Sequence, residues 1–387
     1  MAFPRTLVVL AVASALVVTC GNDVAQVPDP VSIVAGKLTA ASPTPACVDL
    51  PTSVPTTLST RDKLAQLLMV GVSDAADAKA VVTDHHVGGI MIGSWTDLSM
   101  LTNGALTDIT RNSGPLPLAV SVDEEGGRVS RLKSLIGTAS SARMLAQTST
   151  VDQVYGMALD RGHKMRDLGI TIDFAPVVDV TDAPDDSVIG GRSFSSDPAV
   201  VTAYAGAYAR GLRDAGVLPV LKHFPGHGHG SGDSHIGGVT TPPLQDLQTN
   251  DLVPYRTLVA DAPVGVMLGH LEVPGLTGDD PASLSPAVVQ LLRTGANYGA
   301  PPFNGPVFSD DVSSMAAISD RYGLVDAVLR TLQAGTDIAL WVSTQTVPTV
   351  LDRLEKVVSA GELAMSAVDA SVVRVATIKG FGSECGR

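Results

Sequence analysis

The sequence predicts a single (β/α)8 barrel of the TIM type. Short apolar runs alternate with helical patterns from residue 58 onward, and about eight of these runs can be counted as strands. Polar residues recur just after the runs, and the carboxyl ends of parallel strands meet on one face of a barrel. Both observations favour a closed barrel over an open sheet and predict one active-site face.

Residues 1–20 are predicted to be an export signal outside the fold. Arg5 supplies a positive start, and the apolar run from Leu7 to Val18 is too short to span a bilayer. The run leads into Cys20 in a sequence similar to a bacterial lipobox, although Thr19 stands where Gly or Ala is usual. We therefore expect Cys20 to be lipidated and to anchor the protein to the outer face of the cell membrane. An ordinary secreted protein with an unpaired Cys20 is the alternative.

Residues 21–57 are predicted to form a tether, since prolines lie among Ser, Thr and Ala without hydrophobic periodicity. Residues 58–387 then form the barrel domain. Cys47 and Cys385 lie one near each end of that domain, and two cysteines in an exported protein are a natural disulfide pair. In the entropic model, a bridge closing so long a loop stabilises the fold by roughly 4–5 kcal/mol. Two free thiols are the alternative.

The elements of the barrel can be placed in order from their apolar patterns. Thr60 is expected to cap a helix that presents Leu64, Leu67 and Leu68 on one face. Further helices are expected at 153–168, between Ser196 and Gly216, from Ser285 onward and at 324–334. The expected strands are 87–92, 117–122, 172–177, 216–221, 264–268, 306–308 and 337–340.

The segment Lys222–His235 is the densest in titratable groups. It holds Lys222, Asp233 and four His among five Gly or Pro, so we expect a loop at the end of the preceding strand. Three interpretations stay open here: a solvated polar loop, a metal site, and general acid–base catalysis by His235 oriented by Asp233. The spacing of the histidines is not a zinc signature.

Asp310 and Asp311 end another apolar run. Successive strand residues point to opposite sides, so we expect one acid at the barrel mouth and the other orienting neighbours or capping the next turn. A carboxylate nucleophile with a separate proton donor about 5–5.5 Å away is the arrangement of retaining glycosidases. A carboxylic acid needs burial to stay protonated near neutrality, whereas an ordinary histidine, with a pKa of about 6.5, does not.

Two glycine-containing loops bring arginines to the same face. Residues 123–131 follow one predicted strand and include Arg131, and residues 187–194 follow the next and include Arg192. Guanidinium groups suit sugar hydroxyls and acetamido groups through charge-assisted hydrogen bonds. An internal salt bridge to a neighbouring acid is the alternative for either arginine.

The composition excludes two classes of partner. The formal charge is -13, and no basic run is present. Such a chain is not expected to bind nucleic acid or an anionic membrane surface, so a lipid anchor would be its link to the membrane.

The segment Lys222–His235 closely resembles the K-H-F-P-G-H-G-x-x-x-x-D-S-H motif of glycoside hydrolase family 3 β-N-acetylglucosaminidases of the NagZ type. The similarity covers about residues 58–376 and implies a single barrel without the second domain of many members. Four further stretches match the family, namely 123–131, 188–194, 308–315 and 334–337.

This resemblance implies that Asp310 is the nucleophile, that His235 is the acid/base and that Asp233 is its partner in a dyad. It implies no metal and no cofactor. Glu124 stands where the family usually has Gln, and His229 where it usually has Asp, which puts loop geometry and pH response in question. The residues implied to bind the terminal N-acetylglucosamine are Asp123, Arg131, Arg192, Lys222 and His223.

We therefore expect an exported, monomeric, retaining exo-β-N-acetylglucosaminidase that acts on peptidoglycan fragments. A glycoside phosphorylase with the same dyad is one alternative, because a histidine adds no negative charge beside an incoming phosphate. The others are a metallohydrolase and a solute-binding lipoprotein without catalysis, although binding alone requires no proton-transfer pair.

Overall fold

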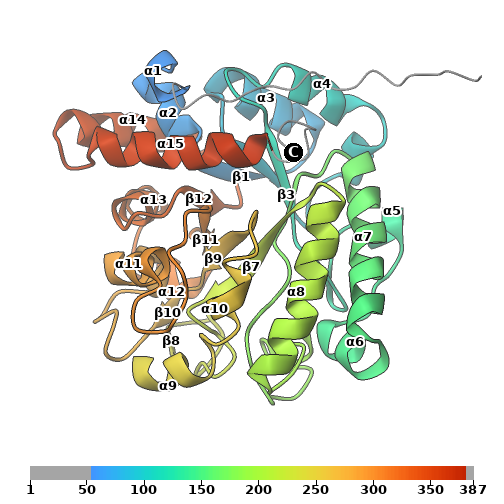
Figure 1. Ribbon diagram of the computed structural model, residues 1–387. Helices are drawn as coiled ribbons and strands as arrows, with labels where there is room; N and C mark the ends of the chain where they lie inside the picture. The colour runs from blue at the N-terminus through green and yellow to red at the C-terminus, as the bar shows by residue number, and fades with distance from the viewer. Residues whose placement is uncertain (1–53, 381–387) are drawn as a thin grey trace, which may run out of the picture. The chain divides into compact units, whose positions relative to one another are not determined.

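The computed structural model describes residues 54–380, which contain a closed barrel with helices around it (Figure 1). The strand order around the wall is β1-β12-β11-β9-β7-β6-β3-β2, and β1 closes the barrel by parallel pairing with both β12 and β2. The predicted (β/α)8 barrel is confirmed. Its strands are β1 (Leu68–Val72), β2 (Gly89–Ile92), β3 (Ala119–Val122), β6 (Ile172–Asp173), β7 (Leu218–Phe224), β9 (Gly265–Leu268), β11 (Val307–Asp311) and β12 (Ile338–Trp341).

Helices follow every barrel strand in the chain. Those that connect strands or follow the last one are α3 (Ala75–His85), α4 (Ala105–Arg111), α7 (Val151–Asp167), α8 (Pro198–Asp214), α10 (Tyr255–Leu258), α11 (Pro286–Thr294), α13 (Leu324–Gln333), α14 (Val347–Ser359) and α15 (Met365–Lys379). The remaining helices are α1 (Val54–Thr57), α2 (Thr60–Ala65), α5 (Lys133–Ile136), α6 (Ala142–Thr148), α9 (Leu244–Thr249) and α12 (Ala316–Ser319), with 3-10 turns at Leu98–Leu101, Gly190–Arg192 and Ala282–Leu284.

Two small sheets lie outside the barrel sheet. One pairs β4 (Glu124–Gly126) with β5 (Val129–Ser130), and the other pairs β8 (Val239–Thr240) with β10 (Leu271–Glu272). Because they follow β3, β7 and β9 in the chain, they shape the loops at the carboxyl ends of those strands.

The two long helices α7 and α8 begin where local capping signals place them, and they run side by side in Figure 1. The hydroxyl of Thr150 accepts the backbone N–H of Gln153 at 3.2 Å, and the Gln153 side chain accepts the N–H of Thr150 at 2.8 Å. Asp197 caps α8, and Pro198 occupies its first turn. Both helices agree with the sequence prediction to within two or three residues.

The first helix is shorter than predicted. α2 ends before Leu67, and the hydroxyl of Ser59, rather than Thr60, caps its start. Leu68 was expected on the apolar face of this helix but instead begins β1. A continuous apolar run suits a buried helix and a buried strand equally, so periodicity could not locate the boundary.

Strands β7 and β6 also differ from the prediction. Lys222, His223 and Phe224 complete β7, so the motif begins in the strand and only then becomes a loop. β6 contains only two residues instead of 172–177, and the chain meets β7 again at a bridge between Val177 and Lys222. Pro176 has no N–H to donate, which explains the interruption.

The interior of the barrel is filled by side chains. Phe174 and Phe308 meet edge to face with ring centroids 5.6 Å apart, and the hydroxyl of Ser309 accepts the N–H of Leu340 at 3.0 Å. A barrel filled in this way leaves its mouth, at the carboxyl ends of the strands, as the place for a binding site.

Several predictions concern residues at the ends of the chain. Cys20, Cys47 and Cys385 lie outside the described residues, so the lipid anchor and the disulfide stay predictions. α1 occupies the last four residues of the segment predicted as tether. Within residues 54–380, no helix has both the length and the apolar character needed to cross a membrane.

Candidate active site

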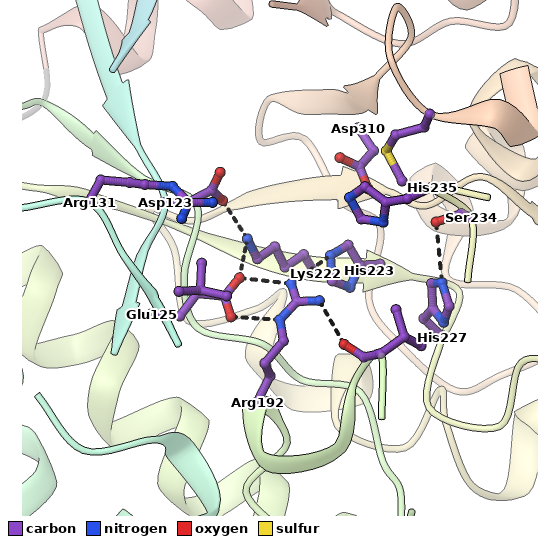
Figure 2. Close-up of a pocket in the computed structure, with 13 residues that line it drawn as sticks. Asp123, Glu125, Arg131, Arg192, Lys222, His223, His227, Ser234, His235 and Asp310 are labelled. Carbon is purple, nitrogen blue, oxygen red and sulfur yellow. Dashed lines mark hydrogen bonds and ion pairs between the residues drawn. The ribbon is translucent and has the colours of Figure 1, made fainter. Parts of the chain in front are cut away.

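A pocket opens at the carboxyl ends of β3, β7 and β11, on the face where the sequence predicts the active site (Figure 2). Asp233 is not in its lining but lies behind His235. The other predicted site residues all line it, namely Asp123, Arg131, Arg192, Lys222, His223, His235 and Asp310.

Four charged side chains, Asp123, Glu125, Arg192 and Lys222, form what we call the wall cluster. Nζ of Lys222 lies 2.7 Å from Oδ1 of Asp123 and 2.6 Å from Oε1 of Glu125. Nε and Nη2 of Arg192 each donate to Glu125 over 2.8 Å. Figure 2 shows the four side chains converging beside the pocket. Arg192 therefore makes the internal salt bridge that was its alternative reading and lines the pocket as well.

Glu125, Lys222 and Arg192 of the wall cluster stay charged near neutral pH. Burial alone would raise the pKa of Glu125, but Arg192 and Lys222 hold it well below its ordinary range. Burial opposes the charge of Lys222, yet Asp123 and Glu125 raise the pKa of Lys222 above its ordinary value. The pKa of Arg192 is likewise raised by Glu125 against the effect of burial. The cluster thus presents fixed donors and acceptors to a polar ligand.

Arg131 is a cation of the pocket that lacks a carboxylate partner. No residue within 54–380 accepts a hydrogen bond from its guanidinium, and its Nε is buried. Oε2 of Glu124 fixes the backbone by accepting the N–H of Arg131 at 2.8 Å and that of Leu132 at 2.7 Å. The backbone at Arg131 is therefore fixed, and its guanidinium is available to a ligand.

Glu124 points away from the pocket, in contrast to Asp123 and Glu125 on either side of it. It is fully buried, and its Oε1 lies 2.6 Å from Nη2 of Arg161. Alternation along an extended chain explains why neighbours face opposite sides. The negative charge that Glu124 adds in place of the usual Gln is thus neutralised by Arg161.

The side chains of Asp310 and Asp311 lie in different surroundings, as the sequence predicts. Asp310 lines the pocket, while Asp311 accepts the N–H of Ser313 at 2.8 Å and caps the turn after β11. Burial would raise the pKa of Asp310, but His223, His270 and the backbone N–H of Asp311 hold it below its ordinary value. Asp310 is therefore ionised near neutral pH, as a nucleophile must be.

His270 supports the backbone at the end of β11. It is 1% exposed, and its Nε2 lies 2.8 Å from the carbonyl oxygen of Asp311. Since a carbonyl only accepts, Nε2 donates, and Nδ1 accepts the hydroxyl of Ser283 at 2.7 Å. Burial lowers the pKa of His270, which favours this neutral ring.

Asp233 and His235 lie on residues 225–238, which we call the dyad loop. Oδ1 of Asp233 lies 2.7 Å from Nδ1 of His235 and accepts its backbone N–H at 3.0 Å. Burial would raise the pKa of Asp233, but the N–H groups of His235 hold it below its ordinary value. An ionised carboxylate can only accept, so Nδ1 carries a proton and Nε2 is left for the pocket.

The dyad loop is fastened to two neighbouring elements. Backbone N–H groups of α12 donate to the carbonyls of Ser234 at 3.1 Å and His235 at 3.4 Å. At the other side, Ser231 and Thr240 exchange two hydrogen bonds of 2.9 Å. Because α12 follows β11, these contacts tie the dyad to the strand that ends in Asp310.

Asp179 organises two histidines of the motif. Its Oδ2 lies 2.7 Å from Nδ1 of His223, and its Oδ1 accepts the backbone N–H of His227 at 2.7 Å. The two imidazole rings meet edge to face with centroids 5.9 Å apart. Burial would raise the pKa of Asp179, but His223 and His227 lower it. Asp179 is thus a positioning residue behind the pocket.

His229, the second departure from the family pattern, is paired with Asp251. Its Nδ1 lies 3.0 Å from Oδ1 of Asp251. That hydrogen bond raises the pKa of His229 against the opposing effect of burial. Gly228 lets this part of the loop approach the barrel, since a Cβ there would lie 1.9 Å from the carbonyl oxygen of Val180.

Some lining residues had no role predicted from the sequence, namely Glu125, His227, Ser234, Val129, Val188 and Met315. Glu125 could have been found, because it lies two residues from Asp123 on an extended segment and therefore on the same face. Within the described part of the chain, no three His, Cys, Asp or Glu side chains are grouped as a metal ion requires.

Comparisons with known proteins agree with one another. Residues 59–378 match the model of the glycosyl hydrolase family 3 N terminal domain. The chain is 71% identical to Beta-hexosaminidase LpqI of Mycobacterium tuberculosis over 391 residues, which cover 100% of both chains. The solved structure of M. tuberculosis LpqI has a TM-score of 0.86 at 74% identity and covers 88% of this chain and 99% of its own. A family 3 beta-N-acetylglucosaminidase from Paenibacillus sp. has a TM-score of 0.78 at 31% identity, covering 85% of this chain and 64% of its own.

Proposed function

Since the chain belongs to glycosyl hydrolase family 3 and is a β-hexosaminidase, we propose that it removes terminal β-linked N-acetylglucosamine from peptidoglycan fragments with retention of configuration. The observation that most supports this mechanism is that Asp310 and His235 face one pocket, with His235 held by Asp233. An ionised carboxylate and a proton donor in one site are the parts that a retaining glycosidase needs.

In the first step of the proposed mechanism, a carboxylate oxygen of Asp310 attacks the anomeric carbon. Nε2–H of His235 gives its proton to the glycosidic oxygen, so the leaving sugar departs as a neutral alcohol and a covalent glycosyl-enzyme forms. Asp233 stabilises the protonated ring before this transfer and keeps Nε2 toward the pocket.

In the second step, the roles of the two groups reverse. Neutral His235 takes a proton from a water molecule, whose oxygen attacks the anomeric carbon and displaces the carboxylate of Asp310. The sugar leaves with the β configuration, and both side chains return to their starting protonation states.

The binding of the terminal sugar is assigned to Arg131, His223 and the wall cluster. The guanidinium of Arg131 has no other acceptor among the described residues, so it can donate to a hydroxyl or acetamido oxygen of the sugar. The wall cluster adds charges that need no reorganisation when the substrate binds, which favours the transition state.

Peptidoglycan is proposed as the source of the substrate because of location as well as chemistry. A protein exported and anchored through Cys20 would meet fragments of the cell wall, in which N-acetylglucosamine is β-linked to N-acetylmuramic acid. The anchor can be tested by labelling cells with a radioactive fatty acid. Label that appears on the wild type and not on Cys20→Ala supports it, and equal label on both contradicts it.

The covalent mechanism can be tested by trapping. A 5-fluoro analogue of N-acetylglucosaminyl fluoride should form a slowly hydrolysed adduct, found by mass spectrometry on the peptide that contains Asp310. Asp310→Ala should form none, and Asp311→Asn serves as the matched control that retains the adduct. Turnover of the parent sugar without an adduct in the wild type would contradict the retaining mechanism.

The substrate can be tested with the disaccharide of N-acetylglucosamine and N-acetylmuramic acid. Release of N-acetylglucosamine, first as the β anomer by proton NMR, is the expected result. Sugar 1-phosphate formed in phosphate buffer would identify a phosphorylase instead. Binding of the disaccharide without any turnover would favour a solute-binding protein.

A further inference from the structure

We propose, on the basis of the function proposed above, that Trp95 binds the sugar of the leaving group at the rim of the pocket. Trp95 lies three residues after the end of β2 and is 46% exposed. Large exposed hydrophobic residues are few in the described part of the chain, and this one belongs to the catalytic face of the barrel. Small-molecule sites are commonly lined by aromatic side chains.

Two glycines leave space for the indole ring. A Cβ on Gly71 would lie 2.8 Å from Cζ2 of Trp95, and a Cβ on Gly93 would lie 2.4 Å from Cη2. Gly71 is near the end of β1, and Gly93 directly follows β2. The same Gly71 position is 2.9 Å from the backbone of Val342, which directly follows β12. The ring therefore packs on the carboxyl ends of these three strands.

The turn that carries Trp95 is fixed by hydrogen bonds. The hydroxyl of Thr96 donates to the carbonyl of Val72 at 2.6 Å and accepts the N–H of Gly93 at 2.9 Å. The N–H of Asp97 donates to the carbonyl of Ser73 at 2.8 Å. An aromatic ring on a fixed turn loses little freedom when a ligand stacks on it.

The barrel order places Trp95 on the part of the mouth that faces the dyad loop across the barrel. β12, β1 and β2 form the part of the wall between β11, which ends in Asp310, and β3, which precedes Asp123. With about 4.8 Å between neighbouring strands, β1 is about 10 Å along the wall from β11, which is the length of one or two sugar rings.

The opposite side of the mouth belongs to the dyad loop. β7, from which this loop leaves, lies across the barrel from β1, and Ile236 beside His235 is 81% exposed. A leaving group that takes its proton from His235 therefore departs between Ile236 and Trp95. The pocket itself is lined mainly by charged and polar groups. The apolar face of the leaving-group sugar therefore stacks on the indole ring of Trp95.

The proposal is tested with two substrates that share the same terminal sugar. For the disaccharide of N-acetylglucosamine and N-acetylmuramic acid, Trp95→Ala should lower kcat/KM about ten-fold, mainly through KM. For β-N-acetylglucosaminyl fluoride, whose leaving group has no ring, kcat/KM should stay unchanged. Trp95→Phe should recover most of the loss. Equal effects of Trp95→Ala on both substrates, or no effect on either, would overturn the proposal.

Fluorescence gives a second readout. The chain has two tryptophans, and Trp341 is fully buried, so ligand-dependent emission should come from Trp95. In an inactive Asp310→Asn background, the disaccharide should shift the emission, and Trp95→Phe should remove that shift. A shift that survives in Trp95→Phe contradicts the proposal. A wild type that hydrolyses neither substrate would refute the proposed function itself, which is a different result.

Discussion

The wall cluster and the dyad loop bring charged groups to one pocket in contrasting ways. Lys222 and Glu125 of the wall cluster are 3% and 5% exposed, whereas His235 and Asp233 of the dyad loop are 61% and 35% exposed. The buried groups form a closed network with fixed charges, and the exposed pair is a single hydrogen-bonded dyad. The difference supports the proposed mechanism, in which the wall cluster orients the sugar and the dyad loop transfers the proton.

The largest effect should come from Asp310, the proposed nucleophile, which lines the same pocket as the two regions. Replacing Asp310 with Gly should lower kcat at least about 10⁴-fold, because no other described carboxylate of the pocket is free of a cationic partner and able to attack. Sodium azide should restore turnover and give the α-glycosyl azide, measured by NMR. Failure of azide to rescue, with a folded variant, would argue that Asp310 is not the nucleophile.

Breaking the wall cluster should cost stability as well as activity. Glu125→Gln leaves Arg192 and Lys222 in a buried site with one carboxylate fewer, and we expect a loss of about 3 kcal/mol in the free energy of unfolding. The matched control is Asp352→Asn, which breaks the exposed pair with Arg61 and should cost less than about 1 kcal/mol. Urea titration measures both, and similar losses for the two variants would contradict the contrast between buried and exposed charges.

Breaking the dyad should affect catalysis without such a loss of stability. Asp233→Asn keeps the size of the side chain but removes the charge that faces Nδ1 of His235. We expect kcat/KM for the disaccharide to fall on the order of 10²-fold. A dinitrophenyl glycoside, whose leaving group needs no proton, should keep its kcat/KM. An equal fall for both substrates would mean that Asp233 acts on the fold of the loop and not on proton transfer.

The same contrast explains what the sequence could predict. Asp123, Lys222 and Asp310 were assigned to one site because each follows a predicted strand, and the barrel brings strand ends together. For the nearby pair Asp233 and His235 the spacing leaves three interpretations open, and the resemblance to the family selects the acid–base dyad. Contacts between distant segments could not be predicted, since Arg161 is 37 residues from Glu124 and Arg192 is 67 residues from Glu125.

The fold shows a similar limit. The sequence pattern located helix α8 and most of the barrel strands, because caps and glycines mark their ends. It did not predict β1, because the apolar end of α2 is followed directly by the apolar strand. The boundary between helix and strand is fixed only by the pairing of β1 with β12 and β2 in the closed barrel. Trp95 was not singled out, since its contacts with Gly71 and Val342 exist only once three strands are side by side.

The smallest effect should arise where the dyad loop meets the barrel, at His229 and Asp251. The pKa of His229 is raised by its bond to Asp251, so its contribution to stability is complete below the unfolded pKa of about 6.5 and is lost as pH rises through the folded value. Burial also raises the pKa of Asp251, so ionisation of this carboxyl likewise lowers stability as pH rises above its unfolded value of about 3.9. His229→Gln should therefore lower the free energy of unfolding by about 0.5–1 kcal/mol at pH 6 and by little at pH 9, with His163→Gln on the exposed face of α7 as the control.

The wall cluster contains no histidine, so a pH-dependent effect of this kind is expected only in the dyad loop. If His229→Gln also lowers kcat/KM for the disaccharide at pH 6 while leaving it unchanged at pH 9, the pair fixes the loop that presents His235. A loss of stability that is the same at both pH values would instead mean that His229 contributes by packing, since a neutral contact does not depend on protonation. The dyad loop would then be held by its hydrogen bonds to α12 and Thr240, and its position would not depend on pH through His229 and Asp251.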